Sequence, residues 1–290
     1  MDELRIATRS SALATAQAEQ VAACLRGAHP DLTTRLVPVR TSGDEDRTSP
    51  VTSLTEVGAF VRAVQRAVVE GRADLAVHSA KDLPVLGPSE LTQFHPVRGP
   101  VWDVLCGANL AALPTGARVG TGSPRRAAQL ARLRPDVAIV PVRGNVDTRL
   151  GLVTRGEVGA VVLAEAGLER LGRNGDFHHR FSLEEMVPAP AQGALAIEAL
   201  AGSRAARLAE VLVDPATVAS VGAERRLLGI TGAGCRSALG ALGEVEGDHI
   251  RLTGFVADEW GPRRAEVLGA DPEQAADLLS RALAAGGGTW

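Results

Sequence analysis

Residues 117–133 read ARVGTGSPRRAAQLARL, and this stretch changes from a strand pattern to a helix pattern within a few residues. The run 117–120 predicts a short strand. The residues after it predict a turn, because Ser123 can cap a helix and Pro124 suits the first helical position. Residues 125–133 then predict a helix. A strand followed directly by a helix is the repeating unit of α/β folds, so this stretch indicates the fold class.

The same unit recurs along the earlier part of the chain. Strands are predicted at 4–8, 36–39, 73–77, 117–120, 137–142 and 158–163. Helices are predicted at 12–25, 57–70, 125–133, 146–153 and 166–171. Residues 41–56 are polar and predict a loop. Strands that alternate with helices form mostly parallel sheets, so we expect an α/β architecture here.

The C-terminal part has a different pattern. A helix is predicted at 215–228 and a glycine-rich loop at 229–235. Three strand-like runs follow at 238–245, 249–257 and 263–268, and a last helix at 272–285. Successive strands flanked by helices predict a small α+β domain.

Composition limits the possible functions. The chain has 290 residues and a net charge of −3, and only 3% of its residues are aromatic, which argues against nucleic-acid binding. Its three cysteines lack C-x-x-C spacing, so neither a disulfide framework nor a zinc site is expected, and no other metal-ligand cluster is evident. The sequence has no apolar run of membrane-spanning length and no apolar core near residue 1. We therefore expect a soluble, cytoplasmic protein without a membrane partner.

Three predicted strand-to-helix turns carry arginine, at Arg9, at Arg125 with Arg126, and at Arg143. A helix N-terminus attracts anions, and a guanidinium beside it makes a carboxylate or phosphate site. Three such turns favour a ligand with several anionic groups, with the arginine heads facing that ligand rather than a core. Solvated surface turns are the alternative. Residues 120–122 lack the glycine patterns that ATP or NAD sites require.

Lys81 is the single lysine of the chain, beside 30 arginines. The occurrence of lysine at this one position is explained either by neutral sequence drift or by a need for a compact ammonium group there. Asp82 comes next, after a predicted buried strand, where a carboxylate can stabilise a developing cation or act as a general acid. His78, at the end of that strand, is predicted to make a structural hydrogen bond.

The three cysteines have different surroundings in the sequence. Cys235 lies in the glycine-rich run GAGCR, where Arg236 favours the thiolate. Spacing alone leaves two roles open for Cys235, namely covalent attachment of a group or a small buried residue. Cys24 lies in a predicted apolar helix stripe and Cys106 in an apolar run, so both are expected in the core.

Seven motifs occur together in one order: IATRSSALA, VHSAKDLP, VGTGSPRR, VRGNVDTRL, LAEAGLERLG, PAQGALAIE and GAGC. In these motifs the chain resembles the hydroxymethylbilane synthase, or porphobilinogen deaminase, family along nearly its whole length. The resemblance implies two α/β lobes similar to those of periplasmic binding proteins and a small α+β domain. The implied boundaries are 1–97 with 190–212 for the first domain, 98–189 for the second and 213–290 for the third.

The resemblance also implies the chemistry. A dipyrromethane cofactor would be held by a thioether to Cys235, and four porphobilinogen molecules would condense on it with loss of ammonia. Hydrolysis would release hydroxymethylbilane, a precursor of haem and other tetrapyrroles. The implied catalytic residue is Asp82. The implied cofactor contacts, besides Cys235, are Lys81, Ser123, Arg125, Arg126 and Gln192. The implied substrate contacts are Arg9, Ser11, Arg143, Arg149 and Arg170. A monomer is expected.

The chain departs from the family pattern at three places. Residues 56–60 lack the lysine of the family's glycine-rich run. Ala238 stands close to the position where family members usually have a proline. Trp102 occupies a position that is commonly basic in the family. A non-catalytic receptor for an oligocarboxylate is the competing function, because it would explain the arginine turns without Asp82 or Cys235. A Schiff-base enzyme using Lys81 fits less well, since Asp82 should raise the lysine pKa.

Overall fold

The computed structural model describes residues 3–39, 55–232 and 238–285. The chain in it divides into two units. Unit 1 comprises Met1–Arg98 and Ala194–Val218, and unit 2 comprises Gly99–Gly193 and Ala219–Trp290. The chain therefore returns to unit 1 after it has built the first part of unit 2.

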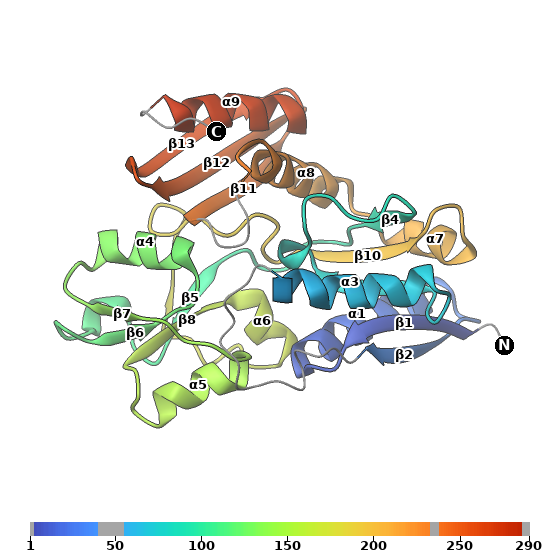
Figure 1. The fold of residues 1–290 in the computed structure, drawn as a ribbon, viewed down its shortest axis with the longest axis horizontal. Coiled ribbons are helices and arrows are strands. Elements are labelled where there is room, and N and C mark those ends of the chain that lie inside the picture. Colours follow the sequence, from blue (N-terminus) through green and yellow to red (C-terminus); the bar gives the residue numbers. More distant parts are fainter. Residues whose placement is uncertain (1–2, 40–54, 233–237, 286–290) are drawn as a thin grey trace. The chain divides into compact units, whose positions relative to one another are not determined.

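Unit 1 contains a five-stranded sheet in the order β2-β1-β3-β10-β4 (Figure 1). Its strands are β1 (Glu3–Arg9), β2 (Thr33–Val39), β3 (Leu75–Ser79), β4 (Leu91–Phe94) and β10 (Leu195–Leu200). Strand β1 pairs in parallel with β2 and β3, whereas β10 runs antiparallel to β3 and to β4. The predicted parallel pairing holds for β2, β1 and β3, whereas β10, the returning strand, makes both of its pairings antiparallel.

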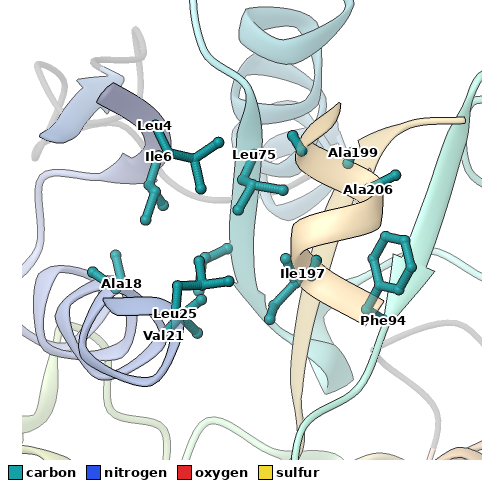
Figure 2. Close-up of a cluster of buried hydrophobic side chains, with 14 of the residues drawn as sticks. Leu4, Ile6, Ala18, Val21, Leu25, Leu75, Phe94, Ile197, Ala199 and Ala206 are labelled. Carbon is teal, nitrogen blue, oxygen red and sulfur yellow. The ribbon is translucent and has the colours of Figure 1, made fainter. Parts of the chain in front are cut away.

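Helices cover both faces of this sheet. Residues Leu4 and Ile6 of β1 pack with α1 (Ala12–Ala28) and α7 (Arg204–Ala209) in one buried cluster. Figure 2 shows this cluster, which includes Leu25 of α1 and Ile197 of β10. The opposite face, with Ala7 and Ala76, packs against α3 (Thr55–Val69). Because successive side chains of β1 point to opposite faces of the sheet, Leu4 and Ile6 meet α1 and α7, whereas Ala7 meets α3.

Unit 2 contains a second five-stranded sheet, in the order β7-β6-β8-β5-β9. Its strands are β5 (Asp103–Cys106), β6 (Arg118–Gly120), β7 (Ala138–Val140), β8 (Ala160–Ala164) and β9 (His179–Arg180). Strand β5 is the antiparallel member, paired with β8 and β9. Helix α4 (Pro124–Leu133) packs on one face, and α5 (Val146–Thr154) and α6 (Glu165–Arg170) lie on the other.

The rest of unit 2 is a three-stranded antiparallel sheet with two helices. Strands β11 (Ala238–Glu246), β12 (His249–Asp258) and β13 (Gly261–Gly269) follow one another in space as in sequence. Helices α8 (Pro215–Ile230) and α9 (Pro272–Ala284) share a buried cluster with them. The predicted α+β arrangement of this part is confirmed. Short 3-10 turns complete the described elements, at Ala80–Asp82, Leu110–Ala112 and Glu210–Leu212.

Several predictions about elements and cysteines need correction. The strands β4, β5, β9 and β10 and helix α7 were not predicted, because each is short and lacks a clear period. The predicted core position of Cys24 is wrong, since its side chain is exposed on α1, whereas Cys106 is buried as predicted. Most of the predicted loop 41–56 lies outside the described residues. Within the described ranges, no helix is both long and apolar enough to cross a membrane.

Candidate active site

A pocket of about 220 Å³ lies in unit 1, at the ends of two neighbouring strands. Arg9 closes β1, and Ser11 caps α1 by accepting a hydrogen bond from the Ala14 amide at 3.3 Å. Asp82 reaches the same pocket from the 3-10 turn that follows β3. Parallel strands end at the same edge of a sheet, which is why residues far apart in sequence meet here. The pocket therefore contains a cation, a hydroxyl and a carboxylate.

Other residues complete the pocket wall. The Arg9 guanidinium carbon lies 4.0 Å above the centre of the Phe60 ring, a cation–π contact with α3. Gln17 of α1 donates a hydrogen bond to the Ser79 hydroxyl at 2.7 Å. Gln17, Phe60, His78 and Ser79 all line the pocket, and the sequence had singled out none of them as site residues. Of the VHSAKDLP motif, Val77, His78, Ser79 and Asp82 line it, whereas Lys81 does not.

Asp82 is exposed in unit 1, whereas its neighbour Lys81 is half-buried and does not line the pocket. The turn that carries both residues is fixed by backbone contacts. The Ala80 amide donates to the carbonyl of Ala194 at 3.0 Å, and the Leu83 amide donates to the carbonyl of Ala80 at 3.2 Å. The carboxylate of Asp82 is thus held on a defined turn yet open to a ligand.

In unit 2, Asp103 is the centre of a buried cationic cluster. Its side chain is fully buried and accepts from Arg125 Nη1 at 2.7 Å and from Arg126 Nε at 2.8 Å. Gln192 Nε2 donates to the same carboxylate at 3.2 Å and to the carbonyl of Val101 at 2.7 Å. With two guanidiniums around one carboxylate, the cluster carries an excess of positive charge.

The expectation that Arg125 and Arg126 face outward from the core is wrong. Both residues are buried, and each also donates to a carbonyl: Arg125 to Val187 at 2.7 Å and Arg126 to Val162 at 2.9 Å. Burial lowers the pKa of Arg125, as does Arg126, while Asp103 raises it. The signal that could have revealed this is Asp103, a charged residue that opens a strand of otherwise apolar residues.

Three further arginines predicted for the site also lie in unit 2. Burial lowers the pKa of Arg149, and the charge of Arg126 lowers it further, so Arg149 lies in positive surroundings. Burial likewise lowers the pKa of Arg170, whose Nη2 donates to the carbonyl of Gly193 at 2.6 Å. Arg143 is exposed just before α5. A desolvated guanidinium in a positive field, as at Arg149, favours a carboxylate ligand.

Two predicted residues remain. Ser123 acts as the N-cap of α4, where its hydroxyl accepts from the Arg126 amide at 3.4 Å. Cys235, the predicted attachment residue, lies outside the described residues. Among the residues that the structure describes, no group of three His, Cys, Asp or Glu side chains could hold a metal ion.

Residues 4–207 match the family model described as porphobilinogen deaminase, dipyromethane cofactor binding domain. The chain belongs to the porphobilinogen deaminase family. A porphobilinogen deaminase of Acidothermus cellulolyticus is 45% identical over 97% of this chain and 87% of its own. One from Stenotrophomonas maltophilia is 42% identical over 98% of this chain and 96% of its own.

This member of the porphobilinogen deaminase family is also distantly similar to solved ligand-binding domains. The substrate-binding domain of a putative molybdenum ABC transporter from Clostridium difficile is 12% identical, with a TM-score of 0.45 over 75% of this chain and 94% of that one. The effector-binding domain of BenM with benzoate is 15% identical, with a TM-score of 0.40 over 80% of this chain and 94% of that one.

Proposed function

We propose that this member of the porphobilinogen deaminase family is a hydroxymethylbilane synthase. It would condense four porphobilinogen molecules head to tail, with loss of ammonia, into hydroxymethylbilane for tetrapyrrole biosynthesis. The observation that carries the proposal is the pocket of unit 1, in which Asp82 and Arg9 lie together in a chain that matches the family over most of its length. That pair of charges suits a substrate with both a cationic reacting centre and carboxylate side chains.

The catalytic role in the proposal falls to Asp82. When porphobilinogen loses ammonia, positive charge develops on the pyrrole ring, and a fixed carboxylate nearby stabilises that charge. Asp82 is exposed at the pocket and its turn is held by backbone hydrogen bonds, so the carboxylate is already in place before reaction. Arg9 and Ser11, at the same pocket, would bind a carboxylate of the substrate.

The dipyrromethane cofactor, attached through a thioether to Cys235, would supply the nucleophilic pyrrole carbon. The donor set of unit 2 fits such a group, since each pyrrole brings two carboxylates and the Asp103 cluster has more guanidiniums than carboxylates. Lys81, Ser123, Arg125, Arg126 and Gln192 are proposed to hold the cofactor. For the buried Arg125 and Arg126, this contact would come in addition to Asp103. Arg143, Arg149 and Arg170 are proposed to bind acetate and propionate groups of the substrate.

The remaining expectations belong to the same proposal. We assign three domains, 1–97 with 190–212, 98–189 and 213–290, and the separate three-stranded sheet supports the last of them. The protein would be a monomer in the cytoplasm, where reducing conditions keep Cys235 available for attachment.

Product formation and intact mass test the proposal together. We expect the purified protein to convert porphobilinogen to hydroxymethylbilane and to carry extra mass equal to two pyrrole units. Cys235→Ser should lack that mass, whereas Cys24→Ser should keep it, because Cys24 is an exposed residue of α1 far along the sequence from the glycine-rich loop. Binding of porphobilinogen by an unmodified chain without turnover would indicate a receptor and would reject the synthase.

A further inference from the structure

A cluster of buried polar side chains lies behind the unit 1 pocket, and the proposed chemistry does not use it. Glu198 of β10 is fully buried. His78 Nε2 lies 3.1 Å from Glu198 Oε2. Gln65 of α3 donates to both carboxylate oxygens, at 3.1 and 3.0 Å, and Gln93 of β4 donates to Oε1 at 3.0 Å. Side chains from three other elements thus converge on this one carboxylate of β10.

The charge of this cluster is well defined. Burial raises the pKa of Glu198, but the hydrogen bond and charge of His78 and the two glutamine amides together lower it by more. The carboxylate is therefore ionised at neutral pH. The amides of Gln65 and Gln93 carry no charge, so they stabilise the carboxylate by hydrogen bonding alone.

Stability alone does not explain such a cluster. Replacing a buried ion pair by well-packed apolar residues is often neutral or stabilising, so a buried pair is weak evidence for stability. On the same face of the sheet, Ala76 of β3 and Val68 of α3 belong to a buried apolar cluster, so apolar side chains fit this part of the core. Fixing one geometry is the better-supported use of a buried polar network such as this one.

The geometry that the cluster fixes is that of the Asp82 turn. His78 lines the pocket and lies two positions before Ala80, where the turn begins. On the far side of the turn, a Cβ built at Gly87 would lie 3.7 Å from Gln65 Nε2 and 4.0 Å from Glu198 Oε1. The cluster therefore includes His78, four positions before Asp82, and lies close to Gly87, five positions after it.

We propose that the His78–Glu198 pair, supported by Gln65 and Gln93, is a positioning pair that holds the Asp82 turn in its catalytic orientation. The pair acts through Asp82, and this role rests on the proposed function. Misplacement of a reacting group by about 1 Å can cost 10²-fold in rate, so loss of the pair should affect turnover more than binding.

The test compares Glu198→Gln with Asp74→Asn. Asp74 accepts three hydrogen bonds from Arg5 immediately before β3, at the end of the strand opposite Asp82, so Asp74→Asn perturbs the same strand away from the turn. We expect Glu198→Gln to lower kcat for porphobilinogen at least about tenfold, with KM changed less than about twofold. Asp74→Asn should keep kcat near that of the wild type. His78→Gln, which can still donate to Glu198, should retain more activity than His78→Ala.

Hydrogen–deuterium exchange gives a readout that needs no turnover. Exchange at residues 79–87 should rise in Glu198→Gln but not in Asp74→Asn. If Glu198→Gln does not fold, Gln93→Ala, which removes one donor to Glu198, should show the same changes to a smaller extent. Unchanged exchange at 79–87 in the folded variants, or equal loss of kcat in Asp74→Asn, would overturn the positioning role. A wild-type protein that does not consume porphobilinogen would instead reject the proposed function, and exchange at 79–87 would still decide whether the pair holds the turn.

Discussion

The guanidinium of Arg126 contacts the fully buried carboxylate of Asp103 through Nε at 2.8 Å and Nη2 at 2.7 Å, a two-point contact inside unit 2. Arg125 contacts the other oxygen of the same carboxylate at 2.7 Å. Both Arg126 nitrogens meet Oδ1, and such charge-assisted hydrogen bonds are stronger than neutral ones. Asp103 therefore fixes where both guanidiniums lie, and any ligand of unit 2 would meet arginines already held in place.

We expect Arg126→Leu to destabilise the protein, because it leaves the buried Asp103 with a weaker cationic environment. Removing one partner of a buried pair typically costs about 3–5 kcal/mol. Urea unfolding measures this loss. Arg132→Leu, at an exposed position of the same helix, should change the free energy of unfolding by less than about 0.5 kcal/mol. A loss below about 1 kcal/mol in Arg126→Leu would show that the pair is not structural.

Asp82→Asn should keep the attached dipyrromethane but lose turnover. The substitution removes the negative charge that stabilises the pyrrole cation, so the rate should fall by roughly 10²-fold or more. Asp82→Glu keeps the charge and should retain more activity. Product formation from porphobilinogen by cofactor-loaded variants measures both effects. Near-normal turnover in Asp82→Asn would exclude Asp82 from the reaction.

Gly193→Ala should be far more destabilising than Gly156→Ala. Both glycines have positive φ, +84° and +72°, a conformation that costs an L-residue about 1–2 kcal/mol. At Gly193 a Cβ would also lie 2.6 Å from the carbonyl oxygens of Gly99 and Pro100, whereas at Gly156 nothing lies within 4 Å. We expect a difference of at least about 2 kcal/mol by urea unfolding. Equal losses of unfolding free energy would mean that residues 99–100 shift to make room for the Cβ at little cost.

Asp136 should contribute to stability in a pH-dependent way. Hydrogen bonding to Arg134 lowers the pKa of Asp136 to about 2. Because the folded pKa lies below the unfolded one, the contribution is complete above the unfolded pKa and is lost as the pH falls toward 2. The difference in unfolding free energy between wild type and Asp136→Asn should therefore shrink from pH 6 to pH 2. Solvent screening of this surface pair keeps the difference small, and a difference that grew on acidification would contradict the assignment.

Local features of the fold could be predicted from neighbouring residues. Ser123 and Pro124 begin α4 as expected, and the VHSAKDLP motif forms a strand followed by the Asp82 turn. Such features depend on interactions within a few residues, such as a cap hydroxyl and the amide three positions later. The polyanion ligand was inferred in the same way, from arginines beside predicted helix starts.

What required the tertiary structure is the pairing of distant residues. Strand β10 inserts antiparallel between β3 and β4 although at least 100 residues separate it from either, and no local period indicates that insertion. Asp103 meets Arg125 from 22 positions away, and Glu198 meets His78 from another strand. The sequence alone determined where strands, helices and charged turns form, because short-range hydrogen bonds and side-chain periods fix them. Which charges become buried and which remain open to a ligand was decided by packing, because burial depends on long-range contacts that no local pattern specifies.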